Sequence, residues 1–172
     1  ACSGTPPDDD ADVLVLAAAS LTDVFGELET IFEREHPGID IEMSFGASSA
    51  LRTQVEQGAP ADVIALADTA VIDALVAGGY VRTPTLFATN ALTIAVPSGN
   101  PGNVTSIDDF TRDDLLLGTC ALQVPCGAYA DEVFAAAAID PRLDTMEPDV
   151  RSLAAKIARG ELDAGLVYVT DV

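Results

Sequence analysis

Three short segments of small residues each follow an apolar stretch and precede a region with helical spacing. They are Ala-Ala-Ala-Ser at 17–20, Phe-Gly-Ala-Ser-Ser at 45–49 and Val-Pro-Cys-Gly-Ala at 124–128. Small residues let the backbone approach a ligand closely, and the first turn of a helix has free N–H groups at the positive end of its dipole. In open α/β sheets the ligand crevice lies beyond the carboxyl ends of the strands, where these junctions fall. The pattern therefore predicts an anion site, although one junction alone would be typical of simple helix capping.

The chemistry available to Cys126 has two interpretations. It lies six positions after Cys120, at the start of a predicted helix, so the two cysteines can form a disulfide or Cys126 can be a thiol with a lowered pKa. A thiol enzyme is the rival function, but the sole histidine, His36, lies beside Pro37 at the far end of a predicted helix, where it is typical of a solvated residue. No group of His, Cys and carboxylate residues has metal-ligand spacing, and no junction carries the Gly-Lys-Thr/Ser of a nucleotide-binding P-loop. Counting free thiols would separate the two interpretations.

The first eleven residues read as a tether. Cys2 follows a small residue and precedes a Pro- and Asp-rich run, a pattern that resembles the processing site of bacterial lipoproteins. Ala1 would then be the last residue of a removed signal, and Cys2 would be acylated. An incidental cysteine is the alternative. A pairing of the other two cysteines would leave Cys2 as the odd one, which favours the lipoprotein interpretation.

Composition and charge limit the partners. Of the 172 residues 49% are hydrophobic and 21% charged, which is sufficient for a buried core. The formal net charge of −20 argues against nucleic acid and against anionic lipid, since both are bound through clustered Lys and Arg. An anionic ligand must therefore be held by local dipoles. No apolar run approaches the ~18 residues that cross a bilayer.

Strands and helices alternate three times in the first half of the chain. Strands are expected at 13–17, 39–45 and 62–66. Helices are expected after Ser20, Ser48 and Asp68, each a good N-cap, with Leu21, Phe25 and their helical neighbours forming one apolar face of the first. This alternation predicts a parallel, doubly wound sheet.

The second half has a similar α/β pattern after a loop rich in Gly, Asn and Pro at 98–103, which is expected to mark the crossing into a second lobe. Strands are expected at 91–96, 115–120 and 164–167, and helices at 106–110, 127–138 and 149–159. We predict a first lobe at 12–90 and a second at 91–172.

Taken in order, the motifs resemble those of the periplasmic molybdate-binding proteins over residues 13–171. They are Ala-Ala-Ala-Ser-Leu-Thr at 17–22, Phe-Gly-Ala-Ser-Ser at 45–49, Gly-Ala-Pro-Ala-Asp-Val at 58–63, Ala-Asp at 67–68, Val-Pro-Cys-Gly-Ala-Tyr-Ala at 124–130, Asp-Val-Arg at 149–151 and Gly-Leu-Val-Tyr at 165–168. No single motif is specific, but the series is. The resemblance implies a type II periplasmic-binding-protein-like α/β fold, in which two doubly wound lobes enclose a ligand cleft.

The same resemblance implies the ligand contacts. Ser20 and Ser48 would donate from hydroxyl and backbone, Cys126 and Val150 from backbone N–H groups, and Tyr168 from its phenol. Three alternatives stay open: an ordinary buried Tyr168, a Val150 that merely begins a helix, and Ser49 as the contact in place of Ser48. No catalytic residue and no cofactor are implied, and molybdenum would enter only as the bound oxyanion.

The function implied is that of an extracytoplasmic solute-binding protein, monomeric, which delivers molybdate or tungstate to the membrane permease of an ABC importer. It would be periplasmic or lipid-anchored. Sulfate is the rival anion, and ligand-sensing domains of transcription regulators share the fold class. The family continues past the position of Val172 with strands and a helix that packs on the first lobe, so that lobe is expected to be incomplete here.

Overall fold

The computed structural model describes residues 11–172. Cys2 and most of the predicted tether lie outside these residues, but Ala11, assigned to the tether from sequence, is the first residue of strand β1. No helix within residues 11–172 is both long and apolar enough to cross a membrane.

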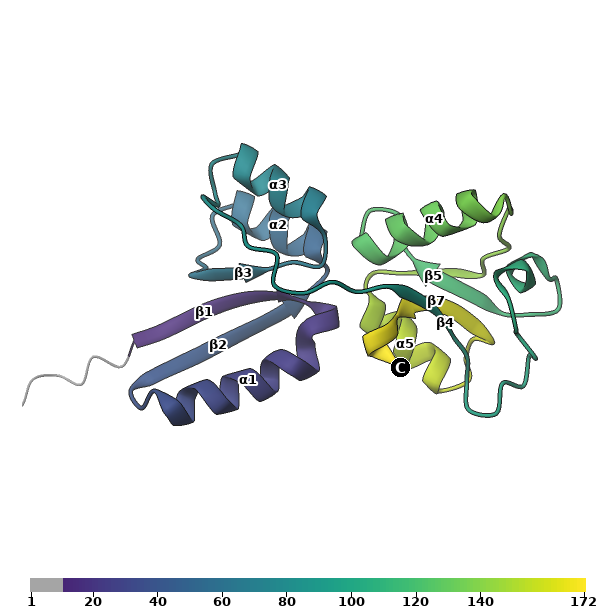
Figure 1. The fold of residues 1–172 in the computed structure, drawn as a ribbon, viewed down its shortest axis with the longest axis horizontal. Coiled ribbons are helices and arrows are strands. Elements are labelled where there is room, and N and C mark those ends of the chain that lie inside the picture. The colour runs from purple at the N-terminus through teal and green to yellow at the C-terminus, as the bar shows by residue number, and fades with distance from the viewer. Residues whose placement is uncertain (1–10) are drawn as a thin grey trace, which may run out of the picture.

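The N-terminal lobe is built on a three-stranded parallel sheet in the order β2-β1-β3. The strands are β1 (Ala11–Ala18), β2 (Ile39–Gly46) and β3 (Val63–Ala65). Helix α1 (Thr22–Glu35) covers one face, whereas α2 (Ser48–Glu56) and α3 (Thr69–Ala77) cover the other (Figure 1). Asp68 caps α3, accepting from the N–H groups of Ala70 and Val71. The predicted parallel, doubly wound arrangement is confirmed.

The C-terminal lobe is built on a four-stranded mixed sheet in the order β4-β7-β5-β6. The strands are β4 (Leu92–Ala95), β5 (Leu117–Cys120), β6 (Thr145–Glu147) and β7 (Ala164–Tyr168). Only β4 runs antiparallel to its neighbour. Helices α4 (Pro125–Ala137) and α5 (Val150–Ala158) lie on opposite faces (Figure 1). Sequence periodicity did not predict β6, because three residues are too few to show an alternation.

Two adjacent glycines bring α5 close to this sheet. Gly118 on β5 and Gly165 on β7 are register partners. A Cβ on Gly118 would lie 3.1 Å from the side chain of Leu153 on α5, and one on Gly165 would lie 2.8 Å from that of Ile157 on α5. Glycine at both positions therefore lets α5 pack against the strands, which fixes where its N-terminus lies.

The apolar stripe of α1 is only partly covered. Leu21 and Phe25 pack on a core cluster with Val15, Ala17 and Ala65. The other apolar residues at the same helical spacing are at least 40% exposed; they are Val24, Leu28, Ile31 and Phe32. The predicted apolar face therefore exists, but α1 has no buried residue and much of this face remains exposed.

The lobes are joined at residues 81–91, which form neither helix nor strand and run between them in Figure 1. The ring of Phe87 lies 6.1 Å from that of Phe25, and Asn90 donates from Nδ2 to Oγ1 of Thr170 at 2.8 Å. The exact boundary at residues 90 and 91 stays a prediction.

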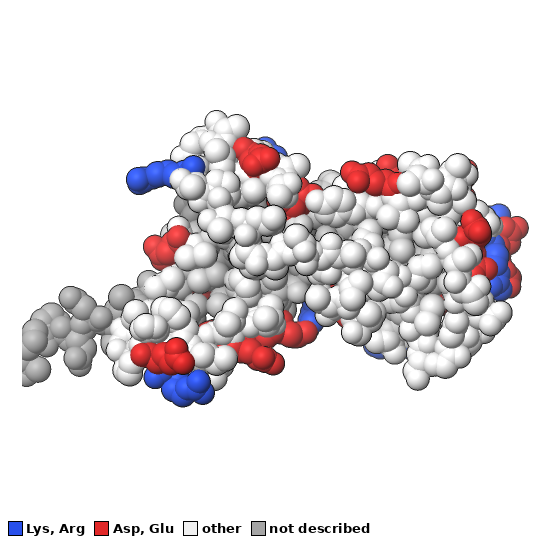
Figure 2. All heavy atoms as spheres, viewed as in Figure 1, with Lys and Arg blue, Asp and Glu red and all other residues white. Residues whose placement is uncertain are grey.

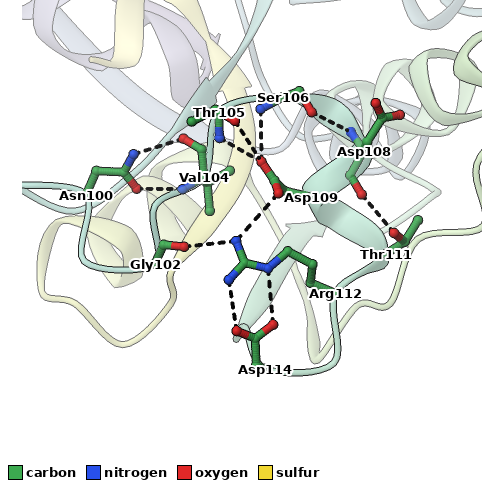
Figure 3. A network of polar contacts seen from close by, with 10 residues as sticks. All are labelled: Asn100, Gly102, Val104, Thr105, Ser106, Asp108, Asp109, Thr111, Arg112 and Asp114. Carbon is green, nitrogen blue, oxygen red and sulfur yellow. Dashed lines mark hydrogen bonds and ion pairs between the residues drawn. The ribbon is translucent and has the colours of Figure 1, made fainter.

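The sequence suggested that the loop at 98–103 marks the crossing between lobes. This prediction was wrong, because β4, which precedes the loop, already belongs to the second sheet. Polar contacts fix this loop within the C-terminal lobe (Figure 3). The Asn100 side chain forms hydrogen bonds with both the N–H and the carbonyl of Val104. Arg112 donates a hydrogen bond to the Gly102 carbonyl and forms an ion pair with Asp114. A 3-10 helix, η2 (Ile107–Thr111), follows behind a capping box. Asp109, the acidic residue of this capping box, accepts hydrogen bonds from the backbone N–H groups of Thr105 and Ser106. These bonds lower the pKa of the Asp109 carboxyl.

Candidate functional site

A cavity of about 20 Å³ lies between the two lobes, and every residue predicted to contact ligand lines it. The N-terminal lobe contributes residues 18–20, 46–48 and 67, and the C-terminal lobe contributes 124–126, 149, 150 and 168. Pockets for drug-sized organic ligands usually measure some 300–1,000 Å³, whereas a single water needs roughly 10–15 Å³. The space is therefore far too small for an organic ligand of that size.

Helix starts supply unused backbone donors to this cavity. Helices α2, α4 and α5 begin at Ser48, Pro125 and Val150. Among the hydrogen bonds of residues 11–172, none uses the N–H of Ser48, Cys126 or Val150. First-turn N–H groups have no acceptor inside their own helix, and the helix dipole places partial positive charge there. Both lobes thus direct neutral donors and dipoles at one space.

Ser20 and Ser48 were predicted to be helix N-caps, but neither occupies an N-cap position. Ser20 lies inside a 3-10 turn, η1 (Ala19–Leu21), because β1 continues to Ala18 and the small residues turn tightly before α1. Ser48 is the first residue of α2, after Ala47 at the N-cap position. Their hydroxyls are consequently not used to cap their own helices.

The Ser48 hydroxyl is held in place by the same lobe. Its Oγ accepts from the Ala67 N–H at 3.1 Å, and the residue is only 2% exposed. With one lone pair occupied, the hydroxyl proton is free for an acceptor in the cavity. Ser49, the alternative contact, does not line this cavity and instead faces a neighbouring groove along α2.

The Tyr168 hydroxyl is buried and has no hydrogen-bond partner among the described residues. Burial, together with the nearby phenol of Tyr129 and the negative charges of Asp68 and Asp171, raises the pKa of Tyr168. The phenol therefore stays protonated and is a donor at neutral pH. A buried unpaired hydroxyl costs on the order of 1–3 kcal/mol, so its position at the cavity calls for a ligand acceptor.

A disulfide joins Cys120 to Cys126 and closes the loop that presents the Cys126 N–H. The loop folds tightly: Ala121 donates to the Glu147 carbonyl at 2.8 Å, and Val124 donates to the Ala121 carbonyl at 3.0 Å. A Cβ on Gly127 would lie 2.1 Å from the Ala121 oxygen, so only glycine fits there. With its sulfur in the disulfide, Cys126 offers no free thiol.

Asp149 is the one carboxylate among the lining residues, and sequence reasoning did not give it a role at the site. Asp149 caps α5: its carboxylate accepts hydrogen bonds from the Ser152 backbone N–H at 2.8 Å and from the Ser152 hydroxyl at 3.0 Å. The spacing Asp-x-x-Ser at a helix start is a recognisable capping signal. The cavity wall holds no Lys or Arg, and the described residues contain no group of three His, Cys, Asp or Glu placed to hold a metal.

Two α/β lobes around a small donor-lined cavity define a solute-binding protein. The chain belongs to the bacterial extracellular solute-binding protein family, whose sequence model matches residues 13–172. The family-level expectation from the motifs is thereby confirmed.

Sequence relatives of this chain include molybdate-binding proteins named ModA. The molybdate-binding protein ModA of Mycobacterium tuberculosis is 39% identical over 160 residues, which are 92% of this chain and 61% of that protein. ModA of Escherichia coli is 34% identical over 183 residues, covering 99% of this chain and 70% of that protein. The chain thus spans about three fifths of the length of its mycobacterial relative.

Solved structures support the fold. The periplasmic molybdate-binding protein of Azotobacter vinelandii superposes with a TM-score of 0.76 at 21% identity, over 93% of this chain and 72% of that one. At this identity the likeness concerns the arrangement of the lobes, and it confirms the predicted periplasmic-binding-protein-like fold.

Proposed function

We propose that this protein captures a tetrahedral oxyanion, molybdate or tungstate, outside the cytoplasm and delivers it to the permease of an ABC importer. The observation that carries the proposal is the composition of the cavity: apart from the Asp149 carboxylate, a small volume is lined by neutral residues with free donors, including the unpartnered Tyr168 hydroxyl. The names of the ModA relatives support the choice of ion.

In this proposal Ser20 and Ser48 donate from the N-terminal lobe, and Cys126, Val150 and Tyr168 donate from the C-terminal lobe. Hydrogen bonds to a charged group contribute roughly 1.5–3 kcal/mol each, so several together offset the desolvation of a dianion. An ion without protons needs donors only. Protonated phosphate must also donate, and backbone N–H groups such as those of Cys126 and Val150 cannot accept. Sulfate is smaller, and a fixed set of donors rejects it by misfit.

Calorimetric titration of the ligand-free protein tests the proposal. Molybdate and tungstate should each bind at one site per chain and raise the melting temperature, because a ligand of the folded state adds RT ln(1 + [L]/Kd) to stability. Phosphate should give no binding heat, and sulfate should bind more weakly than molybdate. Absence of both heat and thermal stabilisation with molybdate and tungstate at millimolar concentration would refute it.

We also propose that Cys2, which lies outside the described residues, carries a lipid anchor. Cys2→Ser should move the protein of a cell that expresses the full precursor from the membrane fraction to the soluble fraction. A wild-type protein that is already soluble and unacylated would contradict this.

A further inference from the structure

One ion pair joins the two lobes. Arg151 Nη1 lies 2.5 Å from Asp23 Oδ2, between the second residue of α5 and the second residue of α1. All other ion pairs among residues 11–172 connect groups within a single lobe. The two helix starts that carry this pair also carry cavity residues, since Val150 precedes Arg151 and η1 with Ser20 precedes α1.

Local helix energetics do not explain Arg151. A cation in the first turn is placed against the positive end of the helix dipole, whereas Asp23 is favourably placed in the first turn of α1. The Arg151 side chain is 45% exposed, so packing does not explain the choice of arginine either. A residue that is unfavourable in its own element points to a role between elements.

A third charged group lies at the same edge of the cleft. Asp171 is half-buried and accepts from the backbone N–H of Tyr168 at 3.1 Å. Burial raises the pKa of Asp171, the positive charge of Arg151 opposes that rise, and the negative charge of Asp23 adds to it. Arg151 thus has a second carboxylate within its electrostatic reach when Asp23 is removed.

We propose that Asp23 and Arg151 are positioning residues that hold the lobes closed over the bound oxyanion and so determine its affinity. The inference rests on the proposed function above. Neither side chain lines the cavity. The pair acts because it connects the helix starts that supply donors from opposite lobes, so the ion pair and the ligand stabilise the same closed arrangement.

The test is a double-mutant cycle with sodium molybdate. Asp23→Asn and Arg151→Gln should each weaken binding about two- to fivefold at low salt, the range expected for an exposed ion pair. The double variant should bind molybdate no more weakly than the single variant with the lower affinity. Arg151→Lys should retain more affinity than Arg151→Gln. The differences should shrink near 1 M salt, where the Debye length is about 3 Å. Arg159→Gln is the matched control, because it breaks a pair with Glu161 within one lobe.

Small-angle scattering of the ligand-free variants separates this inference from the proposed function. Loss of either charge should raise the radius of gyration above that of wild type and of Arg159→Gln. If wild-type protein binds molybdate, additive losses in the double variant or unchanged affinity in the single variants overturn the inference. If it binds no molybdate, the proposed function fails, and an unchanged radius of gyration overturns the pairing role as well.

Discussion

Ser48 shows how a neutral hydroxyl becomes a directed donor. The Ala67 N–H occupies one of its lone pairs, and the first turn of α2 places its own N–H beside the hydroxyl. A dianion in the cavity can therefore receive two hydrogen bonds from one residue. Tyr168, from the opposite lobe, offers a third donor whose proton is retained because burial raises the phenol pKa.

Ser48→Ala should raise the dissociation constant for molybdate about tenfold to a hundredfold, since one hydrogen bond to a charged acceptor contributes roughly 1.5–3 kcal/mol. Titration calorimetry measures the effect. Ser49→Ala is the matched control, because Ser49 is the next residue of the same helix but does not line the cavity. Equal affinities for the two variants would place the anion elsewhere.

Much of the candidate site was predictable at this scale. Parallel strands bring their carboxyl ends to one edge, so small-residue junctions such as 17–20 and 45–49 had to converge in space. The detailed roles were not predictable. Whether a serine occupies the N-cap or the next position depends on where the preceding strand ends, and Ser20 and Ser48 both lie beyond the cap. That Asp149 lines the cavity follows from packing between the lobes.

At the scale of elements, the position of α4 depends on the disulfide loop beneath it. Pro125 occupies the first helical position, where its missing N–H has no cost, and Gly127 lies directly against the Ala121 carbonyl. The loop, the disulfide and the first turn of α4 therefore form one rigid unit that fixes the Cys126 N–H.

Gly127→Ala should lower the free energy of unfolding by about 1–3 kcal/mol and weaken molybdate binding, because the added Cβ displaces loop backbone, which cannot rotate away. Chemical denaturation and calorimetry measure the two effects. The matched control is Gly26→Ala in α1, where a Cβ would meet nothing within 4 Å. That change should stabilise the protein by roughly 0.5–1 kcal/mol through helix propensity. Equal stability of both variants would show that the loop moves freely.

Helix and strand types were predictable because most periodic segments are long. The failures have physical reasons. Strand β6 is too short for a pattern, and the covering of α1 depends on what packs against Val24 and Leu28, which helical spacing does not specify. The crossing between lobes was placed at a Gly- and Asn-rich loop, but such composition is equally suited to the tight, hydrogen-bonded turn that holds Asn100 and Val104 together.

At the scale of the whole molecule, the net charge of −20 opposes the approach of an anion. Acidic side chains are visible on both lobes in Figure 2, and several of the basic ones lie beside acidic groups. The field of these charges reaches about one Debye length, ~8 Å at physiological ionic strength. The cavity donors act over hydrogen-bond distances and are screened far less.

Added salt should therefore speed the association of molybdate, while its dissociation rate changes by no more than the few-fold contribution of the exposed pair between the lobes. Stopped-flow tyrosine fluorescence can follow both rates, because the chain has three tyrosines and no tryptophan. Sodium chloride at increasing concentration is the variable, and an uncharged osmolyte is the control. Association that slows as salt rises would mean that exposed Lys and Arg attract the ion.

The helix starts at the cavity have an evolutionary consequence. A donor supplied by the main chain does not depend on the chemistry of its own side chain, so an apolar replacement of similar size at Val150 leaves it intact, whereas a change at Cys126 would also break the disulfide. Proline is the exception, because it alone lacks the N–H. Mutational tolerance is therefore expected to be higher at Val150, within the limits of its buried position, than at Gly127, although Gly127 is not a proposed ligand contact. Adaptation toward another oxyanion would require shifts in the positions of the first turns of α4 and α5. Such shifts would come from substitutions in the residues that pack beneath these helices.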